Sequence, residues 1–224
     1  MVLASLLLAA GRGKSGPAAS GELSSPEKGL FAYLPGTASI VAGGSYKDFA
    51  GYWKNSPLRP LVQSRWNTPE SATGGWLDCM LKAVGTAFAA TVEIGDAYAT
   101  ARGVISGITA AELEACAGKL EGSKVAKEAG GKFVVVVVDG VPGESGPQKA
   151  GWYFLDDKTV FLVRHFPLVP AAKKNHRFAD LAAVEAALAA AKESPSVDNK
   201  KLVGLANTAR RDGGLWMCGS AESL

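Results

Sequence analysis

The sequence predicts an α+β fold, in which an antiparallel sheet built from hairpins has helices packed on one face. Apolar segments with strand-like alternation occur in pairs joined by short turns, and helix-start signals fall between the pairs. Hydrophobic residues make up 47% of the 224 residues and charged residues 20%, a composition typical of a globular chain with a core. Each half of the chain holds a strand pair followed by a helix, so two similar subdomains meeting at residues 122–131 stay open.

In the first third of the globular part, which we expect over residues 30–224, the pattern is mainly helical. The Pro35-Gly36 turn precedes a strand over residues 38–42. Capping residues, Pro at the first turn, and apolar residues at i, i+3 and i+4 then predict three helices. These helices are expected over residues 45–54, 58–66 and 68–84.

Strand pairs dominate the rest of the chain. The expected strands cover 87–94 and 98–105, 125–127 and 133–138, 150–155 and 159–165, and finally 215–218. The run of five valines after Phe133 is β-branched and lacks polar alternation, which predicts a strand in the middle of the sheet, covered on both faces. Helices are expected after the Thr109–Glu112 capping box, after Asp180 up to Lys192, and after Asp198 up to about Arg210.

The N-terminal residues indicate export. Residues 1–10 are apolar and match the length of the hydrophobic region of a signal peptide, although no positive charge precedes them. Eleven of the nineteen residues in 11–29 are Gly, Ser or Pro, a composition typical of a flexible tether. The alternative is that residues 1–10 form a buried first strand or helix. We favour a leader on an exported bacterial protein, in the periplasm or outside the cell.

The charge pattern argues against nucleic acid as a partner, because the net charge is only +3 and is spread along the chain. The densest basic stretch runs from Arg164 to Arg177, and we interpret it as a solvated segment between a strand and a helix. No apolar run approaches the roughly 18 residues that a membrane-spanning helix needs.

The three cysteines allow one disulfide. Cys79 and Cys116 fall on predicted helices at opposite ends of a strand pair and could be bridged if those helices pack together. Cys218 is left over, which in an oxidising compartment suggests a free thiol or an intermolecular partner. In the cytosol all three would be small buried hydrophobic residues.

Residues that could carry catalysis are few. No G-x-S-x-G motif occurs, and the two histidines and three isolated cysteines match no zinc spacing. The sequence Gly11 to Ser15 resembles a phosphate-binding loop, but Leu8 stands where that loop needs glycine. We therefore predict no catalytic residue, cofactor or metal site. The enzyme alternative is a hydrolase with a site near His165, paired with Asp156 or Asp139.

Four of the five tryptophans lie near a glycine. Indole rings stack well on sugars and hydrophobic ligands, so Trp53, Trp76 and Trp152 are candidate ligand-stacking residues of a small-molecule carrier. The competing interpretation, which we prefer, is that these large rings fill the core of a protein otherwise rich in Ala and Gly.

Residues 31–62 contain a Tyr33-Leu34-Pro35 turn, a strand, a helix and an Asn55-Ser56-Pro57 break. This order resembles the opening of uncharacterised exported proteins of myxobacteria and their relatives. The resemblance implies an envelope location and an α+β body, and it carries no activity or site residues. We therefore expect a non-catalytic binding or structural module of the bacterial cell envelope. Its partner would be a protein or another envelope component, and its oligomeric state stays open.

Overall fold

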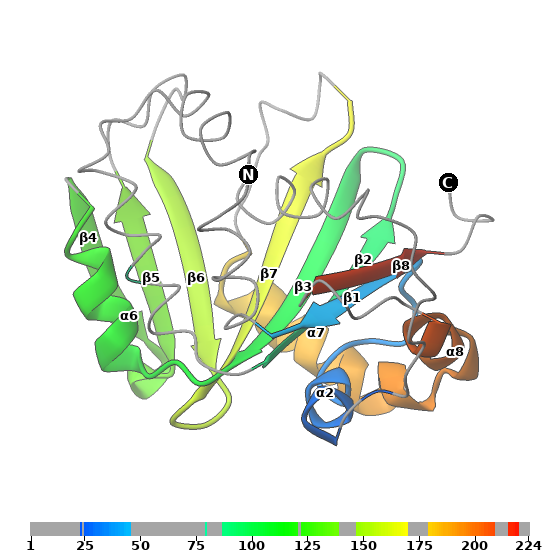
Figure 1. Cartoon of the computed structure of the whole chain (residues 1–224). Coiled ribbons are helices and arrows are strands. Elements are labelled where there is room, and N and C mark those ends of the chain that lie inside the picture. The colour runs from blue at the N-terminus through cyan, green and yellow to red at the C-terminus, as the bar shows by residue number, and fades with distance from the viewer. Residues whose placement is uncertain are drawn as a thin grey trace, which may run out of the picture.

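An eight-stranded antiparallel sheet forms the centre of the molecule (Figure 1). This computed structural model describes residues 23, 25–45, 79, 87–120, 122–138, 147–169, 179–208 and 215–219. The strands are β1 (Ile40–Gly44), β2 (Ala87–Ile94), β3 (Tyr98–Ser106), β4 (Ser123–Glu128), β5 (Phe133–Val138), β6 (Gln148–Phe154), β7 (Thr159–Pro167) and β8 (Leu215–Gly219). The helices are α2 (Ser25–Phe31), α6 (Ala110–Ala117), α7 (Leu181–Glu193) and α8 (Lys200–Thr208).

The sheet order is β4-β5-β6-β7-β3-β2-β1-β8. Each of the three predicted strand pairs is a pair of neighbours, β2 with β3, β4 with β5 and β6 with β7, and all are antiparallel. The predicted α+β class is therefore confirmed. The suggested boundary at 122–131 falls in β4 and the 3-10 turn after it, within this same sheet.

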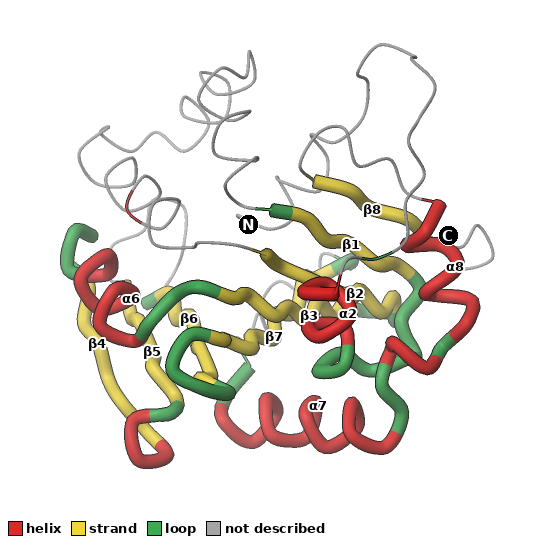
Figure 2. Tube along the Cα trace, turned by 60° about the horizontal axis from the view of Figure 1, so that its bottom comes forward, coloured by secondary structure: helices red, strands yellow, loops and turns green. Residues whose placement is uncertain are grey.

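Helices pack on both faces of the sheet, whereas the prediction placed them on one (Figure 2). Residues of α2, α7 and α8 share a core cluster with Val104, Phe133 and Phe161 on one face. Leu113 and Cys116 of α6 belong to a second cluster, on the opposite face. The physical reason is that successive strand residues point to opposite faces, and both faces here carry apolar side chains that need cover.

Two expected positions need correction. The valine strand β5 is second from the edge of the sheet, not in its middle, because the charged strand β4 ends the sheet beside it. The last helix is capped by Asn199 instead of Asp198: the Asn199 side-chain oxygen accepts hydrogen bonds from the backbone N–H groups of Lys201 and Leu202, at 3.0 and 3.2 Å. Asp198 lies in the preceding 3-10 turn.

The folded part also starts before Leu30. Residues 25–29, expected at the end of the flexible tether, belong to α2, and Leu23 and Glu27 are buried. The carboxylate of Glu27 accepts a hydrogen bond from Trp216 Nε1 at 2.9 Å, which ties this helix to β8. Residues 1–22 lie outside the described residues, as do residues 46–78, so the leader and most of the three helices expected over 45–84 stay predictions.

The sheet opens between β6 and β7, the two strands of one hairpin. Strands β6 and β7 pair only at Tyr153 with Phe161 and at Phe154 with Val160, and they diverge beyond these residues (Figure 1). Strand β7 meanwhile stays paired with β3 over its whole length, from Thr159 to Pro167. The far half of β7 is consequently attached to the β2–β3 hairpin, and it ends beside the turn of that hairpin.

The opening lies next to a glycine that the packing requires. A β-carbon at Gly151 would overlap the ring of Phe133 and contact the carbonyl oxygen of Ala179 at 3.4 Å. We expect Gly151→Ala to lower the free energy of unfolding by about 1–3 kcal/mol, because there is no room for the methyl group. Gly204→Ala is the matched control: nothing lies within 4 Å of an added carbon in α8, so about 1 kcal/mol of stabilisation is expected. Urea unfolding measures both, and equal effects would contradict this account.

The predicted capping box is present at the start of α6. The Thr109 hydroxyl accepts from the Glu112 N–H at 3.2 Å, and the Glu112 carboxylate accepts from the Thr109 N–H at 2.9 Å. The Thr109 hydroxyl also donates to the Glu112 carboxylate at 2.8 Å. The hydrogen bonds that the Thr109 backbone N–H and hydroxyl donate to this carboxylate hold the pKa of Glu112 below its ordinary value.

Because the folded-state pKa is lowered, the carboxylate stabilises the fold above the ordinary Glu pKa and loses this contribution as pH falls through the folded value. We expect Thr109→Ala to lower the free energy of unfolding by about 1 kcal/mol near neutral pH and by less in acid. Urea unfolding across the pH range tests this, with Glu112→Gln as the control. In the Glu112→Gln background the cost of Thr109→Ala should no longer change with pH in the acid range.

Candidate functional site

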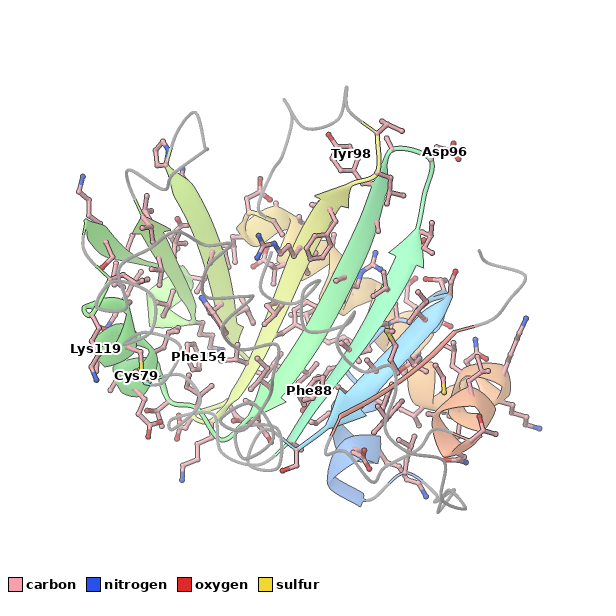
Figure 3. The ribbon with its side chains drawn as sticks, turned by 45° about the horizontal axis from the view of Figure 1, so that its top comes forward. Cys79, Phe88, Asp96, Tyr98, Lys119 and Phe154 are labelled. Carbon is pink, nitrogen blue, oxygen red and sulfur yellow. A yellow bond between two sulfur atoms is a disulfide. The ribbon has the colours of Figure 1, made fainter. Side chains whose placement is uncertain are left out.

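One end of the sheet brings together the turn of the β2–β3 hairpin and the end of β7. The Gly95 N–H donates to the Tyr98 carbonyl at 3.0 Å and closes the hairpin around Asp96 and Ala97. The Leu168 N–H then donates to the Ala97 carbonyl at 2.8 Å, which holds the chain after β7 against this turn. Figure 3 shows Asp96 and Tyr98 at this end of the molecule.

Exposed aliphatic side chains gather at this end. Ile94 is 37% exposed, Leu168 50% and Val169 39%. In register, Ile94 lies opposite Ala99 and Ala99 opposite Phe166, so Ile94 and the half-buried Phe166 share one face about 10 Å apart. We call Ile94, Phe166, Leu168 and Val169 the hairpin-end patch. The other large exposed hydrophobic residues of the described ranges lie apart from one another: Tyr33, Val125 on β4 and Met217 on β8.

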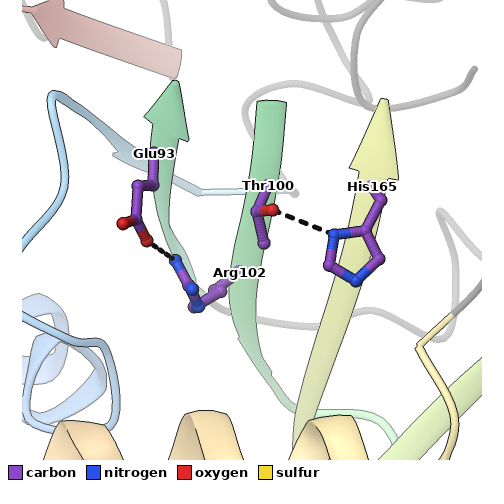
Figure 4. Close-up of polar contacts among 4 residues, drawn as sticks. All are labelled: Glu93, Thr100, Arg102 and His165. Atoms are coloured by element: carbon purple, nitrogen blue, oxygen red, sulfur yellow. Dashed lines mark hydrogen bonds and ion pairs between the residues drawn. The ribbon is translucent and has the colours of Figure 1, made fainter. Parts of the chain in front are cut away.

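A row of polar residues lies on the face of β2, β3 and β7 opposite to Ile94 and Phe166. Figure 4 shows this row. Glu93 accepts from Arg102 Nη1 at 2.8 Å, and the Thr100 hydroxyl shares a 2.9 Å hydrogen bond with Nδ1 of His165. Glu93, Thr100 and His165 face one another across β2, β3 and β7, which explains why residues distant in sequence meet. The Arg102–Glu93 ion pair is partly exposed. Because these two charges neutralise each other, the row presents little net charge to a ligand.

Two buried polar atoms have no hydrogen-bond partner in the described structure: Nε of Arg102, a member of this row, and the hydroxyl of the neighbouring Thr91. These two residues lie directly opposite each other in β2 and β3.

The hydrolase alternative finds no support in the placement of its residues. Asp156 lies in the turn at the other end of β7, and the seven residues from Thr159 to His165 span about 20 Å of extended strand. The Asp156 carboxylate accepts from the Lys158 N–H at 2.8 Å, a hydrogen bond that lowers its pKa. Asp139 lies outside the described residues. Nor do the described residues contain any group of three or more His, Cys, Asp or Glu side chains suited to a metal ion.

Only one of the three candidate stacking tryptophans can be placed. Trp152 of β6 is half-buried and packs against the core cluster that includes Cys116 and Phe154. Its Nε1 is buried without a hydrogen-bond partner in the part of the chain described. Trp53 and Trp76 lie outside the described residues, so a shared binding pocket stays a prediction. Trp216, which was not in that set, is buried in the core.

A disulfide joins Cys79 to Cys116, the pairing that the sequence left open. Their Cα atoms are 5.5 Å apart, within the ordinary range for a disulfide. Cys116 is buried on the inner side of α6, so the bridge anchors residue 79 to this helix. Cys218, on the edge strand β8, is a half-buried free thiol. The sequence signal for the bridge was limited to the position of both cysteines on predicted helices.

The patch itself was not predicted. Ile94, Leu168 and Val169 carry no motif, and each alone resembles an ordinary core residue in the sequence. One signal could have been used. Residues 166–169 read Phe-Pro-Leu-Val, and Ile94 and Tyr98 flank a turn, so both segments are unusually apolar for loop positions. Their proximity depends on the pairing of β3 with β7, which the sequence does not reveal.

Comparison with known proteins finds no matching family model and no matching curated protein. Among solved structures, the chain is similar to TP0453 in its crystal form III, with a TM-score of 0.36 and 9% sequence identity. The match covers 65% of this chain and 50% of TP0453, so the chain spans about half the length of that protein. The resemblance of residues 31–62 to exported myxobacterial proteins stays a prediction.

Proposed function

We propose that this chain is an exported protein of the bacterial cell envelope. It acts as a non-catalytic binding module and docks to an envelope component through the hairpin-end patch. The observation that carries the docking role is the gathering of Ile94, Leu168 and Val169, exposed, at one end of the sheet. Apolar side chains that lie together on a protein surface commonly mark a site of interaction with a protein or a membrane.

The disulfide supports the exported location. Disulfides persist in the periplasm and outside the cell, whereas thiol-reducing systems keep most cytosolic cysteines reduced. The bridge between Cys79 and Cys116 closes a loop over a sequence separation of 37 residues and involves a buried cysteine, which suits a stable structural role. Separately, none of the helices in the described ranges is long and apolar enough to cross a membrane.

Location is tested in the bacterium that produces the protein. Cells are lysed in the presence of iodoacetamide, and the intact protein is weighed by mass spectrometry. An exported, oxidised chain is expected to carry a single alkylated cysteine, Cys218. Alkylation of all three cysteines would contradict export to an oxidising compartment.

Docking is tested by sedimentation of the full-length oxidised protein with isolated bacterial envelopes. Ile94→Ser and Leu168→Ser are expected to reduce the bound fraction strongly, because each removes a side chain that docking would bury. Val125→Ser and Met217→Ser are matched controls, since these residues are 38% and 40% exposed on other strands. Equal binding by all four variants and the unchanged protein would refute the docking role of the patch.

A further inference from the structure

We infer that the component recognised by the hairpin-end patch is the surface of a lipid bilayer, into which this end of the sheet inserts its aliphatic side chains. The inference rests on the proposed docking function and adds the identity of the partner. It is carried by the order of side-chain types along β3 and β7.

The side chains change character with distance from the end of the sheet. Leu168 and Val169 lie at the end, next to Ala97 of the hairpin turn. The aromatic residues Tyr98 and Phe166 come next. Tyr98 lies opposite Pro167, the last residue of β7, and Phe166 is one position further from the end, opposite Ala99. This sequence of aliphatic and then aromatic residues matches the bilayer, where aliphatic groups enter the acyl region and aromatic rings favour the interface.

Charged and polar groups follow the aromatic residues. Arg164 and His165 lie opposite Ala101 and Thr100, one or two residues further from the end than Phe166. The guanidinium carbon of Arg164 lies 5.3 Å from the centre of the Phe166 ring, and the ring of His165 meets that of Tyr98 edge-on at 6.4 Å. Cations beside interfacial aromatic rings are placed where lipid phosphates would lie.

The distance between the aliphatic residues and Arg164 fits the depth to which interfacial proteins enter a bilayer. From Leu168 to Arg164 is four residues, or about 13 Å of extended chain. An interfacial element buries its apolar face roughly 5–10 Å into the boundary between headgroups and acyl chains. The aliphatic residues would therefore lie below the phosphates and Arg164 near them.

The patch is better suited to insertion of apolar side chains into a bilayer than to electrostatic attraction by the bilayer surface. Glu93 and Arg102 neutralise each other by their ion pair, and Asp96 places a carboxylate in the hairpin turn itself. We therefore expect apolar insertion to dominate, with little dependence on salt, and Asp96 to oppose it. A protein partner or a second copy of the chain would not require the graded order of side chains.

The test uses the purified full-length oxidised protein and two kinds of protein-free vesicle: phosphatidylcholine alone, and phosphatidylethanolamine with phosphatidylglycerol. Co-sedimentation is expected with both. Ile94→Ser and Leu168→Ser should each weaken the apparent affinity about tenfold. Asp96→Asn should strengthen it about threefold, since a carboxylate is costly to bring into the interface. Val125→Ser and Met217→Ser should leave it unchanged, and thermal unfolding checks that every variant is folded.

The outcomes separate this inference from the proposed function. If binding to isolated envelopes depends on Leu168 but no protein-free vesicle binds, the docking function stands and the lipid inference is refuted in favour of a protein partner. A concentration-dependent dimer that Leu168→Ser abolishes, without vesicle binding, also refutes it, in favour of a second copy. If neither envelopes nor vesicles bind through the patch, both proposals fail.

Discussion

Loss of the Cys79–Cys116 disulfide is expected to lower the free energy of unfolding by about 4 kcal/mol. The bridge spans 37 residues, and closing a loop of that length removes a corresponding amount of conformational entropy from the unfolded chain. For a chain of this size, such a loss lowers the midpoint of thermal unfolding by about 10 °C. Thermal unfolding of the protein with and without dithiothreitol measures the effect.

The third cysteine supplies the control. Cys218→Ala leaves the bridge intact, so it should unfold close to the unchanged protein and show the same response to dithiothreitol. Cys116→Ala should lower the free energy of unfolding as much as reduction does, and slightly further, because this side chain is fully buried and its removal leaves a small cavity. If dithiothreitol leaves the unfolding midpoint of Cys218→Ala unchanged, the bridge does not stabilise the fold.

Trp216→Ala is expected to lower the free energy of unfolding by about 3–5 kcal/mol, the range for removing a large buried aromatic side chain. The Trp216 ring is 4% exposed, stacks on Phe31 with 6.0 Å between ring centres, and fills the space above Gly43. A β-carbon at Gly43 would lie only 2.6 Å from the indole ring. The loss therefore leaves a cavity between α2, β1 and β8, which denaturant unfolding would measure.

Two further variants separate packing from hydrogen bonding. Trp216→Phe keeps most of the ring but removes the N–H that donates to the buried Glu27 carboxylate at 2.9 Å, so about 1–3 kcal/mol is expected. Met217→Ala, at the adjacent exposed position, should change stability by less than about 0.5 kcal/mol. A loss for Met217→Ala as large as that for Trp216→Ala would contradict a specific core role of the indole.

Local patterns predicted the elements well. The hairpin of β2 and β3 was expected over 87–94 and 98–105 and is observed over 87–94 and 98–106. The capping box of α6 and the Asp180 cap of α7 were likewise confirmed. Each depends on residues within about four positions of one another, so the sequence contains the whole interaction.

Predictions that needed a distant partner did less well. The position of β5 near the edge, the packing of α6 on the second face, and the inclusion of residues 25–29 in α2 all depend on segments far away in the chain. The hydrogen bond from Trp216 to Glu27 joins residues 189 positions apart. No local pattern encodes such a contact, because its energy comes from surfaces that meet only after folding.

By itself, the sequence determined the class of fold, the hairpins, the helix starts at Thr109 and Asp180, and the cysteines available for a bridge, since these follow from side-chain periodicity and local hydrogen bonding. Only the tertiary structure decided which strands neighbour each other, which faces the helices cover, and where apolar side chains stay exposed. Pairing of β3 with β7 places Leu168 beside Ala97, although 71 residues separate them. The hairpin-end patch exists because that pairing carries the end of β7 past the core and into water.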